Sequence, residues 1–154
     1  MTFPPDGLDQ IIATFGDPRP FVSDHKGWES KVLRTFLLPY QLRFGGIPVS
    51  KIRAHAKAGQ YFIAAFKTIE DEGLTDFATE YEGIYAFRCQ RDSDIISTHT
   101  WGIAIDLNAS KNPLGGASTQ DPRIVDIFKQ QGFMWGGDFQ HRKDPMHFQL
   151  ATGY

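Results

Sequence analysis

The sequence predicts an α+β domain with an antiparallel sheet. Its 154 residues are 41% hydrophobic and 14% aromatic, which fits a single globular domain over residues 1–154 with a real core. Helical and strand patterns follow one another without the regular alternation that builds a parallel sheet. The chain has neither an internal repeat nor a low-complexity segment, so we expect one folded unit.

Three segments are predicted to be helices. We expect a short helix over residues 8–15. In residues 54–72 apolar side chains recur every three or four positions, which is the strongest helical pattern in the chain, and Gly73 is a plausible stop. A short connector follows over residues 74–81. Residues 122–131 form the third predicted helix.

Extended structure is predicted between the helices. Residues 21–28 indicate a loop with an extended piece, and residues 31–39 are apolar and extended. After a turn at Gly45-Gly46, residues 47–53 alternate in polarity, which indicates a strand or an entry from strand to helix. Residues 83–88 place aromatic side chains on one face and are predicted to be a strand.

The stretch around residues 97–108 carries the clearest chemical signal. Residues 103–107 are apolar and partly β-branched, as in a buried strand, but they include Asp106. A buried carboxylate is costly unless it is paired or bound to a metal. His99 precedes it in an H-x6-D spacing, and Gly102 between them allows a turn or a close approach of two backbones.

A second cluster lies near the end of the printed sequence. Asp144 stands three residues before His147, and an alternating pattern suited to a strand follows. Two histidines and one aspartate make a three-ligand zinc set that leaves a position for water. Asp144 would then remain for proton transfer.

Composition limits the classes of partner. Sixteen basic residues against 18 acidic ones give a net charge of −2, so we expect neither nucleic acid nor a membrane as a partner. A single cysteine, Cys89, excludes an intrachain disulfide and a cysteine-based zinc site. The first residues lack the features of a secretory signal. We expect a monomer.

These motifs resemble a known family. The run Ser97-x-His99-x-x-Gly102-x-Ala104-x-Asp106, with Trp135-Gly136-Gly137 and Asp144-Pro145-Met146-His147-Phe148 after it, resembles the zinc D-Ala-D-Ala carboxypeptidase family. That family includes VanY-type and VanX-type enzymes and the L-alanyl-D-glutamate endopeptidases of phage endolysins. The resemblance is strongest over residues 83–149. It implies a small antiparallel sheet flanked by helices, like that of the hedgehog signalling domain and the DD-peptidases.

The resemblance also implies a metal site. His99, Asp106 and His147 match the family's Zn²⁺ ligands, and Asp144 matches its catalytic carboxylate. The outer ring N–H of each histidine ligand is expected to bond a carbonyl or a carboxylate. As a general base and then an acid, Asp144 is expected to have a raised pKa.

Four further residues match less specific positions. Arg88 matches an arginine that stabilises the developing oxyanion, and Arg91 is the alternative because the intervening loop varies in length. Ser97 stands where the family has a hydroxyl on the substrate side. Trp135 is expected to shape the substrate cleft, with core packing as the alternative.

The implied function is hydrolysis of peptide bonds in the stem peptides of peptidoglycan. We expect an L-alanyl-D-glutamate endopeptidase of the endolysin type, and the alternative is a D-Ala-D-Ala carboxypeptidase. A third possibility is a non-catalytic hedgehog-like zinc module that binds the cell wall. The missing signal favours a phage lysin, held in the host cytoplasm until its release to the wall; a trimmed signal would instead indicate a secreted or periplasmic enzyme.

Overall fold

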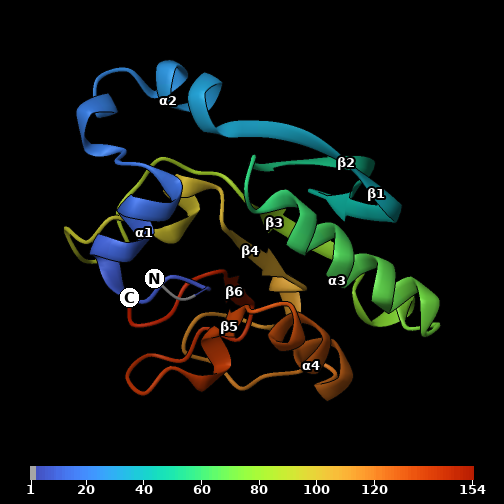
Figure 1. Cartoon of the computed structure of the whole chain (residues 1–154). Helices are drawn as coiled ribbons and strands as arrows, with labels where there is room; N and C mark the ends of the chain where they lie inside the picture. The colour runs from blue at the N-terminus through green and yellow to red at the C-terminus, as the bar shows by residue number, and fades with distance from the viewer. Residues whose placement is uncertain (1–2) are drawn as a thin grey trace.

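The computed structural model describes residues 3–154 and confirms the α+β class (Figure 1). Six strands form one open sheet in the order β2-β1-β3-β4-β6-β5. The strands are β1 (Leu33–Phe44), β2 (Ile47–His55), β3 (Glu80–Gly83), β4 (Ala104–Leu107), β5 (Met134–Trp135) and β6 (His147–Gln149). The α-helices are α1 (Gly7–Phe15), α2 (His25–Val32), α3 (Gly59–Asp71) and α4 (Pro122–Gln130). Neighbouring strands are antiparallel except for β1 and β3, so the sheet is mostly antiparallel, as predicted.

The hydrophobic core lies between the sheet and two helices. Helices α3 and α4 lie side by side along the sheet (Figure 1), and Phe66 of α3 meets Phe128 of α4 at a ring-centroid distance of 5.6 Å. Phe62, one turn earlier in α3, is also fully buried. Burying each such ring stabilises the fold by about 1.5–3 kcal/mol, so this layer holds the sheet in place.

Strand β4 separates the core from the opposite face of the sheet. Ile105 and Leu107 are fully buried, whereas Asp106 between them is only half-buried. Because side chains alternate along a strand, Asp106 points away from the side occupied by its two neighbours. The carboxylate is thereby presented outside the apolar core.

Residues of the N-terminal segment, Gly16 and Trp28, support the turn at residues 98–101 through hydrogen bonds. The short 3₁₀ helix η3 (Thr98–Trp101) receives a hydrogen bond from the indole of Trp28 to the carbonyl of Thr100, at 2.7 Å. In turn, the indole of Trp101 donates to the carbonyl of Gly16 at 2.8 Å. The segments around Gly7 and Thr152 lie close together (Figure 1), and the amide of Gly7 donates to the carbonyl of Thr152.

One helix was not predicted. Helix α2 covers much of the segment expected to be a loop with an extended piece, residues 21–28. Asp24 caps it by accepting a hydrogen bond from the amide of Gly27, and Trp28 and Val32 are buried one turn apart. The Asp cap and the four-residue spacing were the missed signals; the glycine and the polar composition concealed them.

Two predicted boundaries were wrong. The helix expected over residues 54–72 begins only at Gly59, because Ala54 and His55 still pair with β1. The strand expected over residues 83–88 lies earlier, as β3, which begins inside the presumed connector at Glu80 and ends at Gly83. Residues 84–88 instead bond to the loop of η3, for example through the amide of Ala86 to the carbonyl of His99.

No helix within residues 3–154 combines the length and the apolar character that crossing a bilayer requires.

Candidate active site

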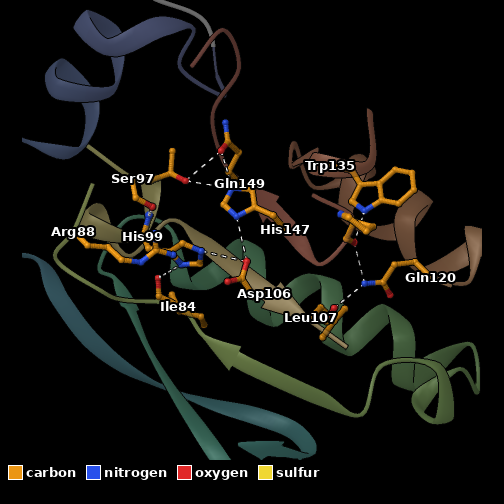
Figure 2. Close-up of polar contacts among 12 residues, drawn as sticks. Ile84, Arg88, Ser97, His99, Asp106, Leu107, Gln120, Trp135, His147 and Gln149 are labelled. Carbon is orange, nitrogen blue, oxygen red and sulfur yellow. Dashed lines mark hydrogen bonds and ion pairs between the residues drawn. The ribbon is translucent and has the colours of Figure 1, made fainter. Parts of the chain in front are cut away.

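The three predicted metal ligands come together in space. His99 lies in η3, Asp106 in β4 and His147 in β6. Strands β4 and β6 pair antiparallel with Asp106 directly opposite His147. One ligand atom from each of the three residues lies within 4.8 Å of the others, and Figure 2 shows both imidazoles pointing at the carboxylate.

Glycine 102 makes the approach of η3 possible, as the sequence predicted. Gly102 ends η3 in the left-handed conformation, at φ 70°. Its carbonyl accepts a hydrogen bond from the amide of His55 at 2.9 Å, and a Cβ there would crowd that amide and the side chain of Leu33. The close contact of Gly102 with β2 therefore holds in place the backbone that connects His99 to Asp106.

The outer nitrogens of both imidazoles have carbonyl partners. His99 Nδ1 lies 2.9 Å from the carbonyl oxygen of Ile84, and His147 Nε2 lies 2.8 Å from Oε1 of Gln149. Because carbonyl oxygens only accept hydrogen bonds, each outer nitrogen carries the proton. This arrangement matches the expected orientation of histidine metal ligands.

The arrangement of the two inner imidazole nitrogens around Asp106 favours a positive charge between them. His99 Nε2 and His147 Nδ1 lie 3.3 and 3.2 Å from the same oxygen, Asp106 Oδ1. In a neutral imidazole protonated at its outer nitrogen, the inner nitrogen is an acceptor that would face an anionic acceptor. A divalent cation among the three groups satisfies this donor set, which is the His₂Asp type that zinc accepts. The residues present therefore fit the predicted metal.

The directions of the pKa shifts of Asp106 and His147 also favour a positive charge in the cluster. Burial raises the pKa of Asp106, but hydrogen bonds from the protonated, imidazolium forms of His147 and His99 outweigh burial and hold the pKa well below its ordinary value. Burial lowers the pKa of His147, but the carboxylates of Asp106 and Asp144 outweigh it and raise that pKa. The carboxylates thus favour a cationic neighbour.

Asp144 lines the same cavity as the three ligands. Its Oδ1 atom is buried and has no hydrogen-bond partner within the described part of the chain. Burial, reinforced by the nearby charge of Asp106, raises the pKa of Asp144 despite the opposing effect of His147. This direction is the one expected for a group that must carry a proton, and the buried Oδ1 atom is available to accept a hydrogen bond from a substrate or a water.

Both predicted arginines line this cavity, whose volume is about 530 Å³, and both are exposed. The guanidinium of Arg88 donates to the neighbouring carbonyl of Cys89, at 3.2 Å. The positive charge of Arg91 acts on Asp144 and opposes the rise of its pKa that burial causes. A third arginine, Arg142, was not predicted; it also lines the cavity and contacts Asp92 at 3.5 Å.

Ser97 lies at the cavity, whereas Trp135 packs against the hydrophobic core, the alternative given for it. Ser97 lines the cavity, but its hydroxyl accepts a hydrogen bond from the amide of His99 and so caps η3. Trp135 lies outside the set of residues that line the cavity. Its indole donates to the carbonyl of Pro145 at 2.8 Å (Figure 2), so its contact is with the chain that carries Asp144.

Sequence reasoning missed the residues that support the ligands. Gln149 lies two positions after His147 on the same strand, which places both side chains on one face and was a usable signal. Its Oε1 also accepts from the hydroxyl of Thr98, at 3.2 Å. The carbonyl of Ile84 and Gln120, whose amide donates to the carbonyls of Leu107 and Pro145, had no local signal, because their partners are distant in sequence.

An α+β domain with a His-Asp-His cluster and a free carboxylate in one cavity defines a candidate metal-dependent hydrolase. Residues 91–150 match the family model described as D-alanyl-D-alanine carboxypeptidase. The resemblance noted from the sequence motifs is therefore confirmed for this segment, and it supports a metallopeptidase that acts on peptidoglycan. The matched segment contains all three candidate ligands and Asp144, whereas Arg88 precedes it.

Proposed function

We propose that this protein is a zinc peptidase that hydrolyses a peptide bond in the stem peptides of peptidoglycan. One observation carries the proposal: two imidazoles present their inner nitrogens to one oxygen of Asp106, and Asp144, whose buried Oδ1 has no hydrogen-bond partner among residues 3–154, lines the same cavity. A purely structural ion would need the first feature but not the second.

The residues divide the chemistry among them. His99, Asp106 and His147 would hold the zinc ion. When bound, zinc lowers the pKa of a water from about 15.7 towards roughly 7 and polarises the scissile carbonyl. Asp144 accepts the proton of the attacking water as the new C–O bond forms. It returns this proton to the amine as the C–N bond breaks, and burial, which raises the pKa of Asp144, favours its holding the proton between the two steps.

An arginine completes the site by facing the oxyanion. We assign this role to Arg91 before Arg88, because both side chains line the cavity but the guanidinium of Arg88 already donates to the carbonyl of Cys89. Removing one such donor typically raises the barrier by about 2.7–4 kcal/mol. Ser97 acts indirectly, by fixing the turn that carries His99.

The first candidate bond is that between L-alanine and D-glutamate. An endopeptidase must accommodate chain on both sides of the bond. A second hollow of about 780 Å³ lies beside β1, β2 and residues 81–85 and shares no lining residue with the cavity at the ligands. Because Gly83 is the strand partner of Asp106 and the carbonyl of Ile84 bonds His99, we propose that a substrate longer than the cavity continues towards this hollow.

The second candidate is cleavage of a terminal D-alanine. The description of the matching family favours it, and so do the basic side chains of Arg88, Arg91 and Arg142 around the cavity, which could capture a terminal carboxylate. A non-catalytic module that binds the cell wall is a third candidate, but it gives no reason for the unpaired oxygen of Asp144.

Digestion of purified muropeptides tests these alternatives. Products analysed by mass spectrometry would show loss of one terminal alanine for a carboxypeptidase. Separation of the stem peptide after its first alanine would identify the endopeptidase. Either activity should disappear with a chelator and return with zinc. Binding to cell walls without any product would contradict the proposal and favour the module.

We further propose that the protein acts on the wall itself, after release from an infected host or after export. Fractionation of producing cells, with wall degradation measured in each fraction, would distinguish the two routes.

A further inference from the structure

A tight turn carries both Asp144 and His147. The amide of His147 donates to the carbonyl of Asp144 at 3.0 Å, which closes a four-residue turn. The amide of Asp144 donates to the carbonyl of Gly136 at 2.9 Å, and the carbonyl of Met146 accepts from the amide of Leu107 at 2.8 Å. Backbone hydrogen bonds thus hold the turn at both ends.

The middle of the turn is held by two side chains. The carbonyl of Pro145 accepts from the indole Nε1 of Trp135 at 2.8 Å and from Nε2 of Gln120 at 3.2 Å. The same Nε2 atom donates to the carbonyl of Leu107 at 2.7 Å. Figure 2 shows both side chains converging at a distance from the imidazoles. Gln120, 8% exposed, therefore links the residue after Asp106 to the residue after Asp144.

The two glycines after Trp135 make these contacts possible. A Cβ on Gly136 would overlap the carbonyl oxygen of Asp144, so only glycine permits this approach of the two backbones. A Cβ on Gly137 would overlap the ring of Trp135 itself. The segment Trp135-Gly136-Gly137 therefore forms a close-fitting support for the turn.

We infer that Trp135 and Gln120 are positioning residues, which act through the carbonyl of Pro145 to place the Asp144 carboxylate beside the metal ligands. No hydrogen bond to Oδ1 orients the carboxylate within residues 3–154, so its position depends on the backbone of the turn. This inference depends on the proposed function for its catalytic consequence. A misplacement of about 1 Å typically costs about 10²-fold in rate.

Two variants remove the donors and keep the packing: Trp135→Phe and Gln120→Leu. In the full-length zinc-free protein, hydrogen exchange of the His147 amide should become at least about tenfold faster, because that amide closes the turn. In the zinc-loaded protein, kcat on muropeptides should fall about 10- to 100-fold with little change in KM. Zinc content should stay near one ion per chain.

The matched control is Tyr40→Phe. It removes a comparable hydrogen bond, from the Tyr40 hydroxyl to the carbonyl of Ala78 at 2.8 Å, far from the turn in the sequence and in the sheet. The control should leave the exchange of the His147 amide and kcat unchanged.

The outcomes separate the inference from the proposed function. Unchanged exchange in both variants and in their double mutant overturns the inference, and so does faster exchange with an unchanged kcat. If the wild type hydrolyses no muropeptide, the zinc Kd replaces kcat as the second readout. A weaker zinc Kd together with faster exchange then upholds the support of the turn while the peptidase assignment fails.

Discussion

The two sides of the cavity are built differently. The ligand side, His99, Asp106 and His147, lies on η3 and two paired strands, and both histidines are buried and bonded at their outer nitrogens. The arginine side, Arg88, Arg91 and Arg142, is exposed and lies on irregular loops. Its polar contacts are few and long, such as the 3.5 Å contacts of Arg142 with Asp92 and with the carbonyl of Arg91.

This difference separates two requirements of a hydrolase. A cation site needs fixed ligand geometry, which regular structure and buried hydrogen bonds supply. Recognition of a peptide tolerates, and often uses, mobile side chains on loops. We therefore expect substitutions on the ligand side to abolish function, and those on the arginine side to reduce it.

The largest effect is expected from His147→Ala. Losing one of three ligands should remove both the zinc and the activity, because the remaining pair cannot hold the ion tightly. Elemental analysis after dialysis, with a muropeptide assay, measures both. His25→Ala is the control, since His25 is exposed, stacks on Phe87 and does not line the cavity. Full zinc occupancy in His147→Ala would contradict the ligand assignment.

Asp144→Asn should separate metal binding from chemistry. The amide has nearly the same shape but cannot accept the proton of the attacking water, so zinc should remain while kcat falls about 10²–10⁴-fold. Elemental analysis and initial rates of the same preparation measure the two effects. Near-normal turnover would remove Asp144 from the mechanism.

The arginine side should show a graded response. If Arg91 faces the oxyanion, Arg91→Ala should lower kcat about 10²–10³-fold. Arg88→Ala should cost less, since its guanidinium is bonded to the adjacent carbonyl of Cys89. Steady-state kinetics of both variants give the comparison, and the opposite ranking would assign the role to Arg88.

Gln149→Leu tests the support behind a ligand. It removes the acceptor of His147 Nε2 while keeping the volume of the side chain. Zinc affinity should weaken about 10- to 100-fold, as is typical when such a partner is lost. A competition titration against a chelator measures the Kd. An unchanged Kd would mean that strand pairing alone orients the imidazole.

The smallest effect concerns His55, which supports η3 from β2. Its Nε2 lies 2.9 Å from the carbonyl of Phe15, and its Nδ1 accepts from the amide of Lys57, so the neutral ring is fully bonded. Burial lowers the pKa of His55. The unfolded state therefore binds the proton first, and this group's contribution to stability is lost as the pH falls below about 6.5.

Urea unfolding at pH 7 and pH 5 measures this contribution. His55→Gln should lose less stability between the two values than the wild type does. The difference between the two proteins isolates His55, because Asp144 and His147 are common to both. Their raised pKa values act in the opposite sense, favouring the folded state at low pH. Equal losses in both proteins would exclude His55 as the acid-sensitive group.

The ligand side of the cavity could be predicted from the sequence better than the arginine side. His99 with Asp106, and Asp144 with His147, lie close in sequence, so their spacing indicated the site directly. The pairing of Asp106 opposite His147 depends on strand register, which spacing alone does not contain. Residues 84–88, before η3, were wrongly predicted to be a strand. Their backbone hydrogen bonds go to η3 and not to a neighbouring strand.

Neither the contact of Trp135 nor the proposed preference for Arg91 over Arg88 could be predicted from the sequence, for a physical reason. An aromatic residue beside two glycines suggests a cleft, but its partner is a carbonyl ten positions later. Two arginines three positions apart on an irregular loop have no fixed direction, so sequence cannot rank them. The fold class was predictable because the core faces of α3 and α4 follow helical periodicity.

The indoles of Trp28 and Trp101 have a practical consequence for protein engineering. A minimal catalytic fragment cut to the family match, residues 91–150, would omit helices α1 and α2. It would also expose the large aromatic surface of Trp101 to water. The turn that carries His99 would lose the hydrogen bonds that join it to Trp28 and Gly16. Chimaeras and shortened versions of this domain should therefore keep its first 32 residues, although those residues contribute no reactive group.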